Sequence, residues 1–218
     1  DSTVTMQLNL GNDVTFAIRY TLEKGSYMVK MEVLQHNMNR VIPENIPNLD
    51  IVWSQRMMRQ EKGKMFEERN SAIYYKYSNG SVENLSESSA DDEETTGDIK
   101  WVSFKNQFFS SVLVADKCLK GAKMESKPID KNSAFYSDYH KDMELYTSVE
   151  YKSTDENPAN FQIFFGPNKF QLLKSYNKYC DSEDLDLNRL VSLGWALFRW
   201  VNTYIVIPVF DWLTGICG

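Results

Sequence analysis

The chain of 218 residues is 42% hydrophobic and 25% charged, so it can bury a sizeable core without disulfide or metal staples. Its formal net charge of −6 and the lack of a basic stripe argue against a nucleic-acid partner. With two histidines and three cysteines that lack CxxC spacing, we predict no metal site and no cofactor.

The three cysteines leave the redox compartment open. Cys118 and Cys180 could form a disulfide in an oxidising compartment. The odd count, with Cys217 left over, favours free thiols instead. Both states are compatible with the sequence.

Alternation of apolar and polar residues dominates the first three quarters of the chain. Runs such as VTFAIRYTL are rich in β-branched and aromatic residues and are separated by turn residues, which is typical of an antiparallel meander. About ten strands without long helical crossovers predict a mainly β fold, a large antiparallel β-sandwich over residues 1–167. The strands are expected within residues 4–10, 14–22, 27–35, 45–58, 71–79, 99–116, 122–129, 143–153 and 159–167.

Alternating placement assigns most of the aromatic side chains of these strands to the core. In the pairs Phe108-Phe109 and Phe164-Phe165 the two rings point to opposite faces of the strand. Only one ring of each pair can therefore point into the core between the sheets, so a second layer must cover the other ring. The aromatic residues concerned are Trp53, Trp101, Phe104, Phe108, Phe109, Phe161, Phe164 and Phe165.

The stretch ENLSESSADDEETTGD, residues 83–98, is polar, acidic and of low complexity. Such a composition buries little apolar area, so we predict a mobile acidic loop that interrupts the sandwich. A basic partner for this loop is the alternative hypothesis.

After residue 167 the period changes from strand to helix. The segment NKFQLLKSYNKY places apolar residues at helical spacing, and Asn168 is a candidate N-cap. We therefore predict a C-terminal helical segment over residues 168–218.

The final apolar stretch, LVSLGWALFRWVNTYIVIPVFDWL, is expected to be an amphipathic helix that kinks at Pro208 or restarts there. The pieces on either side are each shorter than the roughly 20 residues of a comfortable span, and Arg199 adds a further penalty. The helix could pack on the sandwich, or it could lie in the membrane plane with its aromatic rings at headgroup depth. Both can hold together, with residues up to Arg199 on the sheet and residues 201–218 near the bilayer. The candidate membrane-interface or partner-binding residues are Trp195, Phe198, Arg199, Trp200, Tyr204, Pro208, Phe210 and Trp212.

Signals of enzymatic chemistry are few. No Gly-rich phosphate loop, GxSxG elbow or HExxH helix is present. Sandwich folds of this kind also support sugar chemistry, in which His36 and His140 would act with Glu32 or Glu144 as acid and base. A sugar-binding or aldose-mutarotase-like protein is therefore the enzyme alternative, and a secreted membrane-active protein is a third possibility.

Three segments together resemble the periplasmic domain of the YidC family of bacterial membrane protein insertases, in a form similar to Bacteroidetes-type members. They are IKWVSFKNQFFSSVLV, FQIFFGPNKFQLLKSY and LDLNRLVSLGWALFRWVNTYIVIPVFDWL, all between residues 99 and 213. The resemblance implies a galactose-mutarotase-like super-sandwich and a C-terminal segment that leads into the next transmembrane helix.

The same resemblance implies a location and a role. The domain would lie on the periplasmic face of the bacterial inner membrane as a non-catalytic scaffold of an insertase and chaperone. Its expected partners are the Sec translocon subunits SecDF and SecYEG, nascent membrane proteins and the membrane surface. The isolated domain is expected to be monomeric and to bind no nucleic acid.

Overall fold

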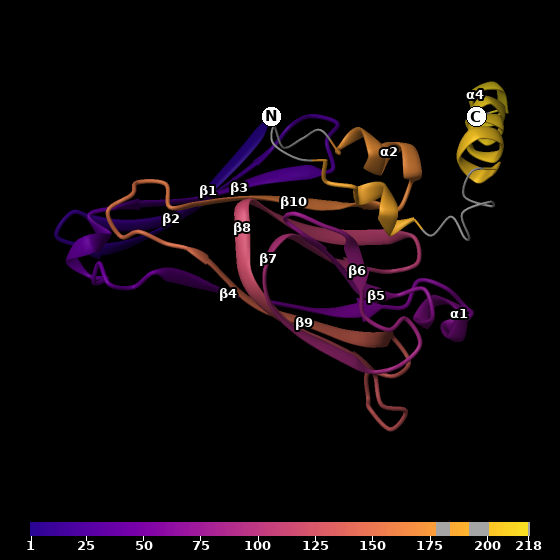
Figure 1. Cartoon of the computed structure of the whole chain (residues 1–218), viewed down its shortest axis with the longest axis horizontal. Coiled ribbons are helices and arrows are strands. Elements are labelled where there is room, and N and C mark those ends of the chain that lie inside the picture. Colours follow the sequence, from indigo (N-terminus) through magenta and orange to yellow (C-terminus); the bar gives the residue numbers. More distant parts are fainter. Residues whose placement is uncertain (178–183, 192–200, 218) are drawn as a thin grey trace.

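The computed structural model describes residues 1–177, 184–191 and 201–217 (Figure 1). In this part of the chain ten strands form one antiparallel sheet that folds over into two layers, which confirms the predicted β-sandwich with C-terminal helices. The strands are β1 (Ser2–Gly11), β2 (Val14–Leu22), β3 (Met28–His36), β4 (Asn48–Met58), β5 (Ala72–Tyr77), β6 (Val82–Asn84), β7 (Asp91–Lys105), β8 (Phe109–Pro128), β9 (Tyr139–Glu150) and β10 (Ala159–Pro167).

The long strand β8 joins the two layers. Its first half pairs with β10 and β7 in a layer of order β1-β2-β3-β10-β8-β7-β5-β6, and its second half pairs with β9, which in turn pairs with β4. Two separate strands were predicted here, over residues 99–116 and 122–129. The structure instead makes residues 109–128 one strand, because Gly121 adopts a φ of 63° and lets the chain bend while pairing continues.

The prediction of a mobile acidic loop over residues 83–98 is wrong for most of its length. Residues from Asp91 onward are the first half of β7 and pair with β8, and Val82–Asn84 form β6. Lysines of β8 offset the carboxylates: Lys123 lies opposite Glu94, and the Lys120 Nζ lies 3.0 Å from Asp98 Oδ2. The hydrogen bond from Lys120 lowers the pKa of the Asp98 carboxyl.

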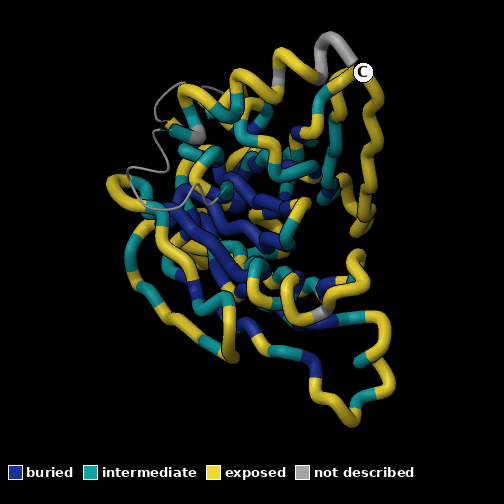
Figure 2. The backbone as a smooth tube through the Cα atoms, turned by 90° about the vertical axis from the view of Figure 1, so that its right-hand side faces the viewer, coloured by how far each residue is buried: buried dark blue, intermediate teal, exposed yellow. Residues whose placement is uncertain are grey.

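The main core lies between the two layers, where the buried residues gather (Figure 2). It combines Val33 and Phe161 of the first layer with Met143 and Leu145 of β9. From β4, the Trp53 ring stacks on Phe104 with ring centroids 3.9 Å apart. Alternation along each strand places these side chains inward and their neighbours outward.

A second core lies on the outer face of the first layer, under the C-terminal segment. Helix α2 (Phe170–Ser175) and the 3₁₀ turn η2 (Leu187–Leu190) cover this face, as Figure 1 shows for α2 above β10. Phe164 is fully buried there with Trp101, whose indole Nε1 donates to the carbonyl of Leu185 at 2.6 Å. The sequence-based expectation that a second layer covers one ring of the pair at 164 and 165 is confirmed for Phe164.

Asn168 does not cap helix α2, contrary to the prediction. The N-cap is Lys169, which makes no side-chain capping bond. Asn168 instead accepts from the Ser110 hydroxyl at 2.6 Å and donates to the carbonyl of Asn106 at 2.8 Å. Its side chain therefore ties the end of β10 to the β7–β8 turn, which removes it from the helix.

Two short helices lie at other corners of the sandwich: η1 (Met38–Arg40) and α1 (Lys64–Glu68). The carboxylate of Glu67 is buried and accepts from the backbone N–H groups of Gln60 and Glu61 and from the side-chain amide of Asn106. These hydrogen bonds satisfy the buried charge and hold α1 against the end of β7.

Candidate membrane and partner interface

The C-terminal helix runs through Pro208 instead of restarting there. Residues Asn202–Val206 form the π-helical turn η3, and α4 follows directly over Ile207–Cys217. Pro208 has no N–H, and its ring clashes with the carbonyl four residues earlier in an α-helix. A wider turn just before the proline accommodates both effects, so the predicted break takes the form of a π-bulge.

One side of η3 and α4 is an exposed apolar surface, which we call the α4 face. At 100° per residue, two adjacent rows share this side of the helix. All six residues are exposed, Tyr204 to 69% and Trp212 to 65%. The rows are Tyr204, Pro208 and Trp212 in one and Ile205, Val209 and Leu213 in the other.

The other side of the same helix is partly protected by the body of the domain. Val206 and Ile207 are half-buried, and with Phe210 they line a cavity of about 310 Å³ against Lys169 and Phe170 at the start of α2. Phe210 itself remains largely exposed at the rim. The helix therefore has a side that faces α2 and a side that faces away from it.

Four of the eight predicted interface residues are placed by the structure, and all four are exposed: Tyr204, Pro208, Phe210 and Trp212. The other four, Trp195, Phe198, Arg199 and Trp200, lie outside the described residues. Within the described ranges, no helix combines the length and the apolar character that crossing a bilayer requires.

A second apolar surface opens between the layers at one end of the sandwich. Phe109 and Phe165, which alternation assigned to the core, are exposed and line a cavity of about 520 Å³ together with Tyr27, Met57 and other residues. Phe108 is also exposed. The prediction that most of these aromatic residues are core does not hold for these three rings. Phe108 lies in the turn between β7 and β8, and no element in the described part of the chain covers that end of β8 and β10, a tertiary property that alternation does not encode.

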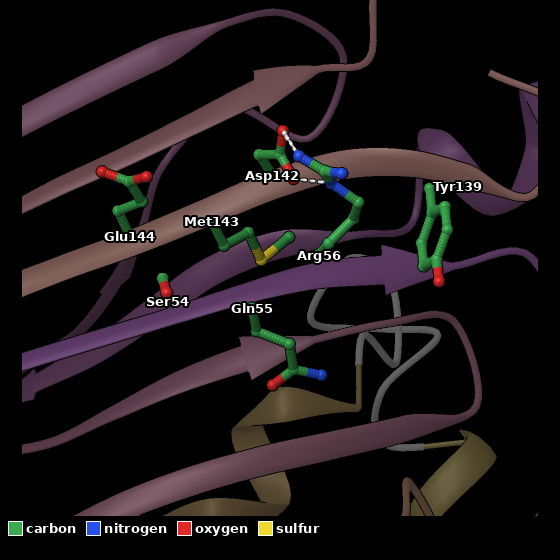
Figure 3. A pocket seen from close by; sticks show the side chains of 7 residues that line it. All are labelled: Ser54, Gln55, Arg56, Tyr139, Asp142, Met143 and Glu144. Carbon is green, nitrogen blue, oxygen red and sulfur yellow. Dashed lines mark hydrogen bonds and ion pairs between the residues drawn. The ribbon is translucent and has the colours of Figure 1, made fainter. Parts of the chain in front are cut away.

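A polar cavity of about 430 Å³ lies on the outer surface of β4 and β9 (Figure 3). The Arg56 guanidinium donates two hydrogen bonds to Asp142, at 2.7 and 3.3 Å, and lies 4.2 Å from the ring centroid of Phe135. The hydrogen bond that Arg56 donates to Asp142 raises the pKa of Arg56. Because Asp142 already neutralises Arg56, the cavity offers an anionic ligand little attraction.

The residues of the sugar-chemistry alternative do not assemble into one site. His36 is half-exposed at the end of β3, where Nε2 lies 3.2 Å from Asp13 and Nδ1 4.0 Å from Glu156. His140 is fully buried at the start of β9. Glu32 pairs with Arg19 and Lys30, and Glu144 accepts from the Tyr146 hydroxyl.

Metal and thiol chemistry find little support in the described part of the chain. No three His, Cys, Asp or Glu side chains there come together as a metal site. Cys118 is a free, half-buried thiol, and burial raises its pKa. A raised pKa keeps the thiol protonated and therefore weakly nucleophilic.

The fold and its C-terminal helix define a class: a β-sandwich domain that carries a helix with one uncovered apolar side. Comparison with known proteins gives the family. The family model described as the YidC periplasmic domain matches residues 1–208, and the chain belongs to this family.

Curated relatives agree with this assignment. The chain is 38% identical to the membrane protein insertase YidC of Parabacteroides distasonis, over 97% of this chain and 33% of that protein. It is also 38% identical to those of Phocaeicola vulgatus and Porphyromonas gingivalis, over 99% and 98% of this chain and 34% of each relative. The chain thus spans about a third of the length of the curated relatives it matches.

Proposed function

We propose that this chain is a non-catalytic scaffold and interaction domain of a YidC-like membrane protein insertase and chaperone, on the periplasmic face of the bacterial inner membrane. The relatives are named membrane protein insertases, which supports this activity for the whole protein. Its clients would be nascent membrane proteins, and its partners the Sec translocon subunits SecDF and SecYEG.

The observation that carries the proposal is the α4 face. An exposed apolar surface of this extent, beside a folded core, is typical of a membrane or partner interface. Tyr204 and Trp212 each lie about one turn from Pro208, on either side of it in the same row, and such rings favour the headgroup region of a bilayer. We place the helix in the membrane plane, with the α4 face toward lipid and α2 on the opposite side.

Vesicle flotation tests this placement. The 218-residue chain should float with phosphatidylcholine vesicles, which carry no net charge and so do not repel a chain of charge −6. Changing Tyr204 and Trp212 together to serine should weaken binding at least tenfold, because each buried ring contributes about 1.5–3 kcal/mol and about 1.4 kcal/mol is tenfold.

The matched control changes Phe66 and Tyr146 together to serine, since these rings are also exposed, Phe66 to 65%, but lie on α1 and β9. The control should float like the unchanged chain. Equal loss in both double variants, or none in either, contradicts the assignment of the α4 face to the bilayer. Vesicles with trapped dye should stay sealed; leakage would favour the membrane-active alternative.

A further inference from the structure

The loop that joins β6 to β7, residues 85–90, is held at its base and open to water along its tip; we call it the strap. Leu85 is buried in the main core. The backbone N–H of Ser86 donates to Asp91 Oδ2 at 2.6 Å. Residues 88–90 are exposed, so their movement away from the sandwich would uncover little apolar area of their own.

Glu87, in the middle of the strap, bonds to three strands. Its carboxylate Oε1 accepts from the Tyr74 hydroxyl of β5 at 2.7 Å and lies 3.3 Å from the Lys105 Nζ of β7. Its backbone carbonyl accepts from the Lys141 Nζ of β9 at 2.8 Å. One strap residue therefore closes over a polar cluster, made of Tyr74, Lys105 and Lys141, which we call the lysine cluster.

The lysine cluster is almost closed to water. Lys141 is fully buried, Lys105 is 5% exposed and Tyr74 is 7% exposed. Burial lowers the pKa of both lysines, and the Glu87 carboxylate opposes this effect in each. Glu68 of α1 also raises the pKa of Lys141, whereas Lys105 lowers it. The two ammonium groups therefore repel each other and share Glu87 as a counter-charge.

We propose that Glu87 is an acid-sensitive latch, whose protonation opens the strap. A neutral Glu87 leaves the two ammonium groups without their shared counter-charge, and a buried charge without a partner is strongly unfavourable. At acid pH a lysine cannot lose its proton to avoid this penalty. Movement of the strap avoids it instead, because water then reaches both ammonium groups.

The latch goes beyond the proposed scaffold role, because it gives the domain a surface that depends on pH. While Glu87 is ionised, the strap is closed and the cluster is neutralised in part. Once Glu87 is protonated, the strap is open and Lys105 and Lys141 present a cationic surface to solvent.

Other titratable groups also face this region, so a change of pH does not isolate Glu87. Glu68 acts on Lys141 from α1, Asp91 accepts a hydrogen bond from the strap, and the buried His140 precedes Lys141 in β9. The decisive comparison is therefore made at constant pH. Glu87→Gln removes the charge and keeps the size of the side chain.

Hydroxyl-radical footprinting of the 218-residue chain, read by mass spectrometry, tests the latch. Tyr74 reports the opening of the strap, and the buried Leu119 of β8 reports global unfolding. At about pH 7, Glu87→Gln should oxidise at Tyr74 at least tenfold faster than the unchanged chain, because loss of a hydrogen bond to a charged group shifts such an opening by roughly tenfold to a hundredfold. Oxidation of Leu119 should not change. The unchanged chain should show the same rise at Tyr74 between about pH 7 and about pH 4.

Glu83→Gln is the matched control, because Glu83 is an exposed carboxylate of β6 that accepts from the Ser81 hydroxyl. It should oxidise at Tyr74 like the unchanged chain. A double variant, Glu87→Gln with Lys105→Met, tests whether charge is the cause. Removal of the ammonium group together with its counter-charge should restore most of the protection of Tyr74.

Three results would overturn the latch. The first is equal oxidation of Tyr74 in Glu87→Gln and Glu83→Gln. The second is a double variant as open as Glu87→Gln, since the strap would then not be held by charge. The third is a loss of Leu119 protection in step with Tyr74, which would show global unfolding in place of a local opening.

Discussion

Replacing Trp101 with alanine is expected to lower the free energy of unfolding by about 3–5 kcal/mol, measured by urea titration. Trp101 is fully buried in the second core, where its ring packs under the C-terminal segment and its indole donates to the carbonyl of Leu185. The substitution leaves a large cavity and removes that donor. It should also detach residues 184–191 from the sheet.

Two further variants separate the packing from the hydrogen bond. Trp101→Phe keeps most of the ring and should cost about 1–2 kcal/mol, with faster amide exchange at Leu185 and Leu187 than at β9. Phe109→Ala removes an exposed ring and should change stability by less than about 0.5 kcal/mol. If Trp101→Ala unfolds at the same urea concentration as Phe109→Ala, the C-terminal segment is not held by this core.

The second large expected effect is a pH-dependent change in the free energy of unfolding, caused by Lys141. Its side chain is fully buried, and its Nζ donates to the backbone carbonyls of Ser71 and Glu87. Burial lowers the pKa of Lys141 to about 8, against about 10.4 for an unfolded lysine. Glu68 and Glu87 oppose that shift, and Lys105 adds to it.

The direction in which stability changes with pH follows from proton binding at Lys141. Between pH 8 and about 10.4 the unfolded chain binds more protons at Lys141 than the folded chain, so stability rises with pH. Relative to Lys141→Met, the unchanged chain should gain about 2 kcal/mol of unfolding free energy from pH 7 to pH 9.5. Tyr75, whose pKa burial raises, is present in both proteins and cancels. Lys105, whose pKa burial also lowers, repels Lys141, so its own proton binding changes slightly in the variant.

Lys123→Met, at an exposed position of β8, is the control and should follow the pH dependence of the unchanged chain. Urea titrations of the three proteins at both pH values supply the comparison. A Lys141→Met variant that tracks the unchanged chain at both pH values would show that the buried ammonium does not titrate in this range.

Alternation was sufficient to predict β2, β3, β4, β9 and β10 because each has one face on a core. Alternation failed for the first half of β7, where an acidic composition suggested a loop. The acidic residues of β7 were interpreted as a loop because they carry no apolar period, yet lysines of β8 across the ladder make a strand favourable. Those partners are remote in sequence, so no local pattern reveals them.

The sequence predicted one exposed apolar surface and missed another. Aromatic rings and a proline at helical spacing indicated the α4 face, including Tyr204 and Trp212, directly from the sequence. The exposure of Phe109 and Phe165 could not be predicted, because it depends on which elements lie next to β8 and β10. The sequence of a single strand does not specify those neighbours.

The most direct test of the account measures the depth of Trp212 in a bilayer. Subtracting the emission of Trp212→Phe from that of the unchanged chain isolates the Trp212 signal in vesicles of brominated phosphatidylcholine. A helix in the membrane plane predicts that bromine near the headgroup quenches this signal more strongly than bromine deep in the acyl chains. No quenching, or stronger quenching from the deep position, would contradict placement of the α4 face at the membrane surface.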